Sequence, residues 1–395
     1  MIQRVVIFGG HIQALGLARQ VKARGLEVII VTDDGCSIAR FSRAVDRTIL
    51  APITEWNVQV NGLKLPNHGT LLFPTNDEAV EMLCEQYDDY KEQFVLGVPK
   101  PETITLFNNK RKAYQFAASH QVSCPKCWYP NTMDEVKEMS ETLPYPVVVK
   151  PAIMYSFHGT FGKKAFRCDD ATSLVDVYEK IAAKHYPLET LLIQEFLDGG
   201  AKNLYSCGVM ALEGEIAVSM QANRIRQNPM DFGNSTTYAI SCYIPEIQEQ
   251  TEALLRMTKY SGIGEVEWMW DAKERVYKFL EINTRAWKWH TISNQLGFSF
   301  IGALIDAYNG VVTTEGVGEL RKKGVKEFTS EEVAWCERLT DFTVAVKEIL
   351  HGRMTLKDVM ASYKIKHESA VWSWKDPLPA VMYVLLSPIL YIKRH

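Results

Sequence analysis

The chain has 395 residues, of which 47% are hydrophobic and 23% charged, proportions typical of a folded protein with a hydrophobic core. This length predicts two or three domains, and the composition excludes a collagen-like, coiled-coil or disordered chain. Lys and Arg number 44 against 47 for Asp and Glu, so the net charge is −3. Without a basic surplus or a basic run, we expect no nucleic-acid partner.

The N-terminal segment MIQRVVIFGG has neither the charged start nor the long apolar stretch of a signal peptide. No stretch of the sequence reaches the ~20 apolar residues of a membrane span. The eight cysteines follow no regular spacing, and Cys124 and Cys127 form an isolated C-x-x-C without further zinc ligands nearby. Two reduced cysteines are therefore favoured over a redox pair, and we expect a cytoplasmic protein.

Apolar runs alternate with helical patterns across the first hundred residues. Residues 5–8 and 28–31 are continuous apolar runs of the kind found in parallel strands buried on both faces, and a helical pattern separates them. Gly9 and Gly10 follow the first run, but the G-x-G-x-x-G pattern is absent. A tight strand-to-helix turn is therefore favoured over a dinucleotide site. The pattern predicts a small, doubly wound α/β domain.

Cations mark the next part of the chain. A helix predicted from residue 110 carries Lys110 in its first turn, where cations oppose the helix dipole unless a phosphate lies nearby; solvated surface cations are the alternative. Lys150 ends an apolar strand, where burial requires an anionic partner. Residues 156–164 contain two glycines and two lysines, which predicts a loop that closes over phosphates, with a surface hairpin as the alternative.

Residues 262–270 and 276–282 alternate in polarity, as the strands of a β-hairpin do. The alternation places Glu265 and Glu267 on one face of the first strand, and Glu281, Asn283 and Arg285 on one face of the second. Carboxylate and amide oxygens suit Mg²⁺ that carries phosphates. A solvated polar strand face is the alternative interpretation.

Taken in order, these features resemble those of the ATP-grasp ligases. The resemblance rests on Lys110, Lys150, the stretch from Gln194 to Leu197, Glu267 and the E-x-N-x-R signature at residues 281–285, and it covers about residues 1–310. Within the superfamily the chain is most similar to the carbamoyl-phosphate-synthase-like branch. Residues 372–379 also resemble the tail of the D-aspartate-ligase-like predicted carboxylate–amine ligases.

The resemblance implies an α/β and α+β architecture in three parts. A Rossmann-like pre-ATP-grasp domain would cover residues 1–106, and a two-lobed ATP-grasp domain would cover residues 107–312. Its small lobe would span about residues 124–196 and its large lobe about residues 197–312. A mainly helical C-terminal extension would follow over residues 313–395, including a helix over 331–350.

The resemblance also implies a role for each site residue. Lys110 and Lys150 would bind the phosphates of ATP. The hinge against adenine would consist of Gln194, Glu195, Phe196 and Leu197. The apolar residues around the base would be Val148, Met269 and Leu280. Mg²⁺, or Mn²⁺ in its place, would be bound by Glu267, Glu281 and Asn283. Arg285 would stabilise the acyl phosphate, and either Arg224 or Arg226 would meet the γ-phosphate.

The implied activity is an ATP-dependent ligase that activates a carboxylate as an acyl phosphate and joins it to an amine, releasing ADP and phosphate. The alternatives are a nucleotide-binding regulatory protein with a degenerate site and a phosphotransferase on the same fold. The acid and the amine are not identified by the sequence, and a homodimer is expected by resemblance. The apolar segment 380–392 is too short to span a bilayer and has three alternative contacts: the inner membrane surface, the core or a partner chain.

Overall fold

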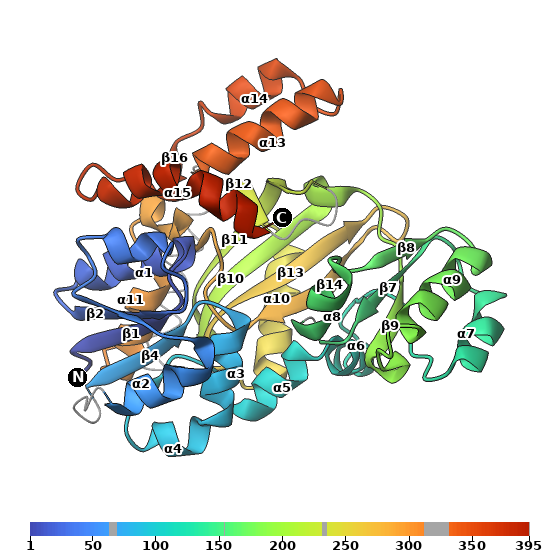
Figure 1. Ribbon diagram of the computed structural model, residues 1–395, viewed down its shortest axis with the longest axis horizontal. Coiled ribbons are helices and arrows are strands. Elements are labelled where there is room, and N and C mark those ends of the chain that lie inside the picture. Colours follow the sequence, from blue (N-terminus) through green and yellow to red (C-terminus); the bar gives the residue numbers. More distant parts are fainter. Residues whose placement is uncertain (63–68, 154, 231–234, 312–331, 395) are drawn as a thin grey trace. The chain divides into compact units, whose positions relative to one another are not determined.

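The computed structural model describes residues 1–62, 69–153, 155–230, 235–311 and 332–394 (Figure 1). The chain forms two compact units. Unit 1 consists of Met1–Ile104, Tyr205–Val266 and Asn283–His395. Unit 2 consists of Thr105–Leu204 and Glu267–Ile282. The predicted boundary between residues 312 and 313 lies outside the described residues.

Unit 1 begins with a parallel sheet of strand order β3-β2-β1-β4-β5. Its strands are β1 (Arg4–Phe8), β2 (Glu27–Thr32), β3 (Arg47–Leu50), β4 (Thr70–Pro74) and β5 (Val95–Leu96). Its helices are α1 (Ile12–Lys22), α2 (Trp56–Gly62), α3 (Asp77–Glu85) and α4 (Tyr87–Lys91), and α5 (Pro101–Asn108) follows. The predicted N-terminal α/β fold is confirmed, because the central strands are parallel and almost fully buried.

The turn from β1 to α1 requires glycine. Gly9 has φ +103°, and a Cβ at this position would collide with Thr75. A Cβ at Gly10 would collide with Ser37. The predicted explanation of this pair as a tight strand-to-helix turn is therefore supported by the local geometry.

A second sheet has the strand order β14-β13-β10-β11-β12-β15-β16. Its strands are β10 (Leu204–Leu212), β11 (Glu215–Asn228), β12 (Ser235–Cys242), β13 (Gly262–Asp271), β14 (Val276–Asn283), β15 (Ala334–Cys336) and β16 (His367–Ser369). Both predicted hairpin strands, β13 and β14, are present. The helices of this part are α10 (Pro245–Met257), α11 (Phe300–Tyr308), α13 (Arg338–Leu350), α14 (Leu356–Ser362) and α15 (Leu378–Arg394).

The helix predicted over residues 331–350 begins later than expected. Strand β15 occupies its first part, pairs with β12 and β16, and is fully buried, and helix α13 starts only at Arg338. The C-terminal extension therefore supplies two strands to the second sheet besides its helices.

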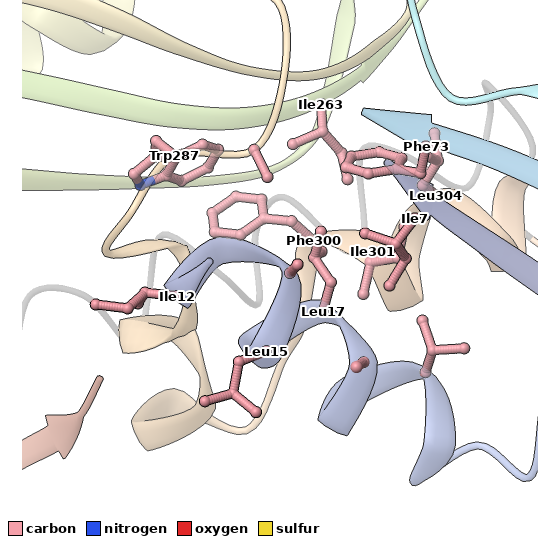
Figure 2. Packing of buried hydrophobic residues seen from close by; sticks show 14 of the residues in the cluster. Ile7, Ile12, Leu15, Leu17, Phe73, Ile263, Trp287, Phe300, Ile301 and Leu304 are labelled. Carbon is pink, nitrogen blue, oxygen red and sulfur yellow. The ribbon is translucent and has the colours of Figure 1, made fainter. Parts of the chain in front are cut away.

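The largest hydrophobic cluster of unit 1 joins its first helix to the segment that follows β14 (Figure 2). Phe300 packs against Trp287 with ring centroids 4.8 Å apart, and Leu17 of α1 lies beside Phe300. Gly208 of β10 allows this packing, because a Cβ there would collide with the Trp287 ring. Residues far apart in the sequence thus share one core.

Helix α15 contacts the core at its N-terminal end. Ala380 and Tyr383 pack against the main cluster of unit 1, so core contact, one of the three alternatives for this segment, is observed. Val384 and Leu385 on the same helix are exposed. Among the described residues, no helix combines the length and the apolar character needed to cross a membrane.

Unit 2 is built on an antiparallel sheet of order β6-β9-β7-β8. The strands are β6 (Cys127–Trp128), β7 (Val147–Pro151), β8 (Phe166–Cys168) and β9 (Leu191–Glu195), and the helices are α6 (Lys110–Ser119), α7 (Met133–Ser140), α8 (Tyr155–Phe161) and α9 (Ala171–Ala182). The prediction of a loop over residues 156–164 is wrong for the first part of this segment, which forms α8. Phe157 and Phe161 lie one helical turn apart and make edge-to-face contacts with Tyr186, and this packing favours the helix.

Candidate functional site

Lys110 and Glu281 form an ion pair within unit 2. Helix α6 begins at Lys110, as predicted, and Asn109 caps it by accepting a hydrogen bond from the Lys112 amide at 3.2 Å. The Lys110 Nζ donates to Oε2 of Glu281. The sequence separates these residues by 171 positions, so the fold itself brings the predicted phosphate-binding lysine to the predicted metal-binding carboxylate.

Lys150 lies at the end of β7 beside the same group of charges. Its Nζ donates to the Tyr114 hydroxyl at 3.0 Å and lies 5.1 Å from the centre of the Tyr114 ring. Burial lowers the pKa of Lys150 to about 8, and the charge of Lys110 acts in the same direction, while Glu281 and Glu267 oppose the shift. The ammonium therefore stands in a place where an added anion would be favourable.

Burial of the Glu281 carboxyl opposes its ionisation, but the neighbouring cations outweigh this effect. Lys110 contributes most, followed by Lys164 and Lys150, and together they lower the pKa of Glu281 to about 2. Glu267 of β13 is 8% exposed, and its charge acts on Lys150. Unit 2 thus gathers three lysines and two carboxylates, which is the charge pattern expected for a nucleotide with a divalent cation.

The predicted hinge lies at the end of β9. Gln194 is 7% exposed, and its Oε1 atom is buried without a hydrogen-bond partner among the described residues. The backbone amides of Glu195 and Phe196 donate to the carbonyls of Lys126 and Pro146 at 2.9 and 3.2 Å. An unsatisfied buried amide oxygen is costly, and a ligand with an N–H group would satisfy it.

The Glu195 side chain is held by a buried lysine that no sequence pattern singled out. Lys278 of β14, with a side chain 1% exposed, contacts Glu195 at 2.6 Å, Asp271 at 2.8 Å and Glu274 at 3.2 Å. Burial of Lys278 favours its neutral form, but Asp271 and Glu195 outweigh it and raise its pKa. The Lys126 amide also donates to Glu195 at 2.9 Å, which fixes the start of the hinge.

The three residues predicted to surround the base lie in different strands of unit 2. Val148 is buried on β7 and pairs in register with Gln194 of the hinge. Met269 on β13 and Leu280 on β14 are half-buried. Leu197 follows the hinge and is also half-buried. The register places Val148 directly beside the hinge, and contacts of the other residues with a base stay a prediction.

Unit 1 holds two of the remaining predicted residues, Arg224 and Asn283, around one buried carboxylate. Glu265 of β13 is 2% exposed and accepts hydrogen bonds from Arg224 at 2.7 Å, Trp289 at 3.0 Å and the Asn283 amide nitrogen at 3.0 Å. Because the Asn283 nitrogen donates to Glu265, the atom of this amide that could act as a metal ligand is its oxygen. Glu265 thus orients Asn283 and Arg224.

Arg226 occupies a different environment from Arg224. Its guanidinium donates twice to Asp341 of α13, both times at 2.8 Å, and both side chains are 0% exposed. Its third nitrogen donates to Ser362 at 3.1 Å. Burial opposes the charge of Arg226, yet Asp341 outweighs it and raises the pKa. This geometry ties β11 to the C-terminal helices and engages the whole guanidinium.

Arg285 follows β14 and forms an ion pair with Asp77 of α3 at 2.5 Å. Its Nη1 donates to the carbonyl of Ala286 at 3.3 Å. The Arg285 side chain is 18% exposed, so water reaches part of the guanidinium. An exposed partner such as Asp77 is readily exchanged for a substrate anion.

Among the residues that the structure describes, no three His, Cys, Asp or Glu side chains come close enough to form a metal site alone. The donor set still fits Mg²⁺, because this ion takes one or two carboxylates and completes its shell with water and substrate phosphate. Glu267 and Glu281 supply two such carboxylates within unit 2. Hard oxygen ligands without thiolates or imidazoles favour Mg²⁺ over zinc or copper.

Comparison with known proteins supports a nucleotide-binding role. Residues 109–302 match the family described as carbamoyl-phosphate synthase L chain, ATP binding domain. A D-aspartate ligase from Enterococcus faecium is 22% identical over 305 residues, which cover 71% of this chain and 70% of that protein. The region that matches the family includes Lys110, Lys150, Glu267 and Glu281.

Solved structures show a similar fold. A biotin carboxylase from Campylobacter jejuni in complex with β-γ-ATP is 18% identical with a TM-score of 0.65, covering 80% of this chain and 73% of that one. The biotin carboxylase domain dimer of the 2-oxoglutarate carboxylase from Hydrogenobacter thermophilus, in complex with MgADP, is 16% identical with a TM-score of 0.61. That match covers 78% of this chain and 70% of that one.

Proposed function

We propose that the chain is an ATP-grasp ligase that joins a carboxylate to an amine while converting ATP to ADP and phosphate. The observation that carries this proposal is the partly buried charge group of unit 2, in which Lys110 pairs with Glu281 beside Lys150. A carboxylate held ionised by lysines is suited to exchange those cations for a metal when phosphates arrive.

Lys110 and Lys150 would bind the phosphates, and the hinge would bind the base. The buried, unpaired Gln194 oxygen supports this assignment, because an amino group of the base would give it the donor that it lacks among the described residues. Glu195 is fixed by Lys278, so its backbone is held in place for recognition of the adenine edge. Val148, Phe196, Leu197, Met269 and Leu280 would contribute the apolar surroundings.

Glu267 and Glu281 would bind Mg²⁺, and Asn283, two residues after Glu281 on the same strand face, would add its amide oxygen. Mn²⁺ would fit the same oxygen ligands. The bound ion supplies positive charge against the phosphates and so offsets the repulsion between an attacking carboxylate and ATP. Glu265 supports this set by accepting a hydrogen bond from the Asn283 amide nitrogen, which fixes the orientation of the amide.

The reaction itself needs charge stabilisation and no protein nucleophile. The substrate carboxylate attacks the γ-phosphorus of ATP, ADP leaves, and the amine then displaces phosphate from the acyl phosphate. Arg224 is the better candidate of the two arginines for the γ-phosphate, because the Arg226 guanidinium already donates hydrogen bonds to Asp341 and Ser362. Arg285 would stabilise the acyl phosphate and the oxyanion that forms on it. A homodimer stays a prediction.

Phosphate release measured with MgATP and paired acids and amines tests the proposal. We expect release that requires both an acid and an amine, with D-aspartate among the acids because the similar curated protein is a D-aspartate ligase. Glu281→Gln should lower this rate by about 100-fold or more, since the variant loses a carboxylate that would hold the Mg²⁺ whose charge offsets that of the phosphates. Glu138→Gln, an exposed position on α7, is the matched control and should leave the rate unchanged.

Three results would contradict the proposal. Phosphorylation of the acid without release of free phosphate indicates a phosphotransferase. Nucleotide binding without turnover for any pair indicates a regulatory protein. Full activity of Glu281→Gln would show that the metal assignment is wrong.

A further inference from the structure

A cavity of about 160 Å³ lies within unit 1, where the chain leaves β1 and enters α1. Its polar lining consists of His11, Gln13, Cys36, Ser235, Lys288 and Tyr383. These residues come from the start of α1, the segment after β2, strand β12, the segment after β14 and helix α15. The roles proposed above for ATP and Mg²⁺ use none of them.

Lys288 presents a fixed positive charge to this cavity. Its Nζ donates to the Ser235 hydroxyl at 2.5 Å and to the carboxylate of Glu337. Glu337 is 1% exposed and also accepts hydrogen bonds from Thr340 and Tyr383. The buried carboxylate is thus surrounded by donors and holds the ammonium in place, and the Lys288 Nζ also lies 5.9 Å from the centre of the Trp335 ring.

The positive end of α1 lies on the same cavity. Ile12 and Gln13, the first two residues of this helix, line the cavity, and His11 at the N-cap makes no side-chain capping bond. The first turn contains no acidic residue. Backbone N–H groups at an uncapped helix start favour an anion, and here they add to the charge of Lys288.

We propose that this cavity binds the carboxylate of a small molecule of amino-acid size, and that α15 is part of the binding site through Tyr383. The volume fits, because a cavity of about 150 Å³ holds a ring of six carbon atoms. The identification of this molecule as a substrate rests on the proposed ligase function. The binding itself does not, since every residue invoked lies in unit 1 outside the ATP site.

Titration calorimetry on the full chain without ATP tests the site directly. The probes are D- and L-amino acids, including D-aspartate, their α-carboxamide analogues, and inorganic phosphate. We expect at least one amino acid to bind, and its carboxamide to bind at least tenfold more weakly. This comparison uses the wild-type protein, so it does not depend on whether a variant folds.

Variants then locate the binding in the cavity. Lys288→Met should weaken binding at least tenfold and Tyr383→Phe several-fold, whereas Lys288→Arg should retain most of it. Lys100→Met, at an exposed lysine of unit 1, is the control and should bind as the wild type does. Equal binding of acid and carboxamide, unchanged binding by Lys288→Met, or binding of phosphate without any carboxylate would overturn the proposal.

The two proposals fail separately. Carboxylate binding that depends on Lys288, with no phosphate release for any substrate pair, supports the cavity and contradicts the ligase reaction. Phosphate release without carboxylate binding at Lys288 supports the reaction and contradicts the cavity.

Discussion

Lys278 shows how a single buried residue controls the predicted hinge. Its ammonium is enclosed by Glu195, Asp271 and Glu274, so removing it leaves carboxylates without a counter-ion in a poorly solvated place. We expect Lys278→Met to raise the KM for MgATP about tenfold with a smaller effect on kcat, because the altered contact is to the bound nucleotide rather than to the transition state. Initial rates at varied ATP concentration measure this.

Lys126→Met is the matched control for that experiment. The Lys126 side chain is 64% exposed, and its ion pair among the described residues is with Glu274. Its backbone amide, which donates to Glu195, is kept in the variant. We expect the control to keep the wild-type KM, since exposed ion pairs contribute little. A normal KM for Lys278→Met would show that the hinge does not need this lysine.

At the level of residues, the sequence predicts a site best where the chemistry is local. The two-residue spacing of Glu281 and Asn283 follows from strand periodicity alone. The structure places Lys110 against Glu281, and their roles stay a prediction. Lys278 was not predictable, because its partner Glu195 lies 83 positions away in the sequence. Glu265 was seen only as a neighbour of Glu267, whereas its contacts to Arg224 and Asn283 depend on the fold.

Among the elements, helix α8 is the clearest departure from the sequence prediction. The two glycines and two lysines of residues 156–164 predict a loop. The four-residue spacing of Phe157 and Phe161 instead matches one helical turn, and this spacing is the sequence feature that indicates the helix. Strand β15 escaped prediction for a different reason. A run of three residues is too short for periodicity to separate a strand from the start of a helix.

The two glycines of this segment distinguish helix from loop. Gly159 lies within α8, has no positive φ and leaves open space where a methyl group would stand, so Gly159→Ala should stabilise the protein by about 0.5–1 kcal/mol. Gly162 has equally open space but φ +63°, so Gly162→Ala should destabilise it by roughly 1 kcal/mol. Denaturant unfolding of unit 2 measures both. Shifts of the same sign in the two variants would contradict the helix boundary at Phe161.

For the whole molecule, the sequence predicts the order of parts but not how distant segments combine. The parallel sheet and the hairpin were predictable from local patterns, and both are present. Arg226 looked like a phosphate-binding residue because no local pattern reveals Asp341, 115 positions later, as its buried partner. That ion pair and strands β15 and β16 make the C-terminal extension part of unit 1, so the extension is not an appendage to the fold.

The stability of the whole chain should depend on one buried histidine that joins such distant segments. His290 is 1% exposed, and its Nε2 donates to the Gln13 carbonyl at 3.2 Å, so Nδ1 is the bare nitrogen and has no partner among the described residues. Burial lowers the pKa of His290 from 6.5 to about 4, although the Gln13 contact opposes the shift.

Between these two pKa values the unfolded chain binds more protons than the folded chain, so stability falls as the pH decreases from about 6.5 towards 4. From pH 7 to pH 5 this single group should cost about 2 kcal/mol. Urea unfolding of the wild type and of His290→Gln, followed by tryptophan fluorescence at both pH values, measures the difference. The variant starts less stable at pH 7, but it should lose about 2 kcal/mol less than the wild type on acidification. Parallel losses in the two proteins would show that His290 is not kept neutral by its burial.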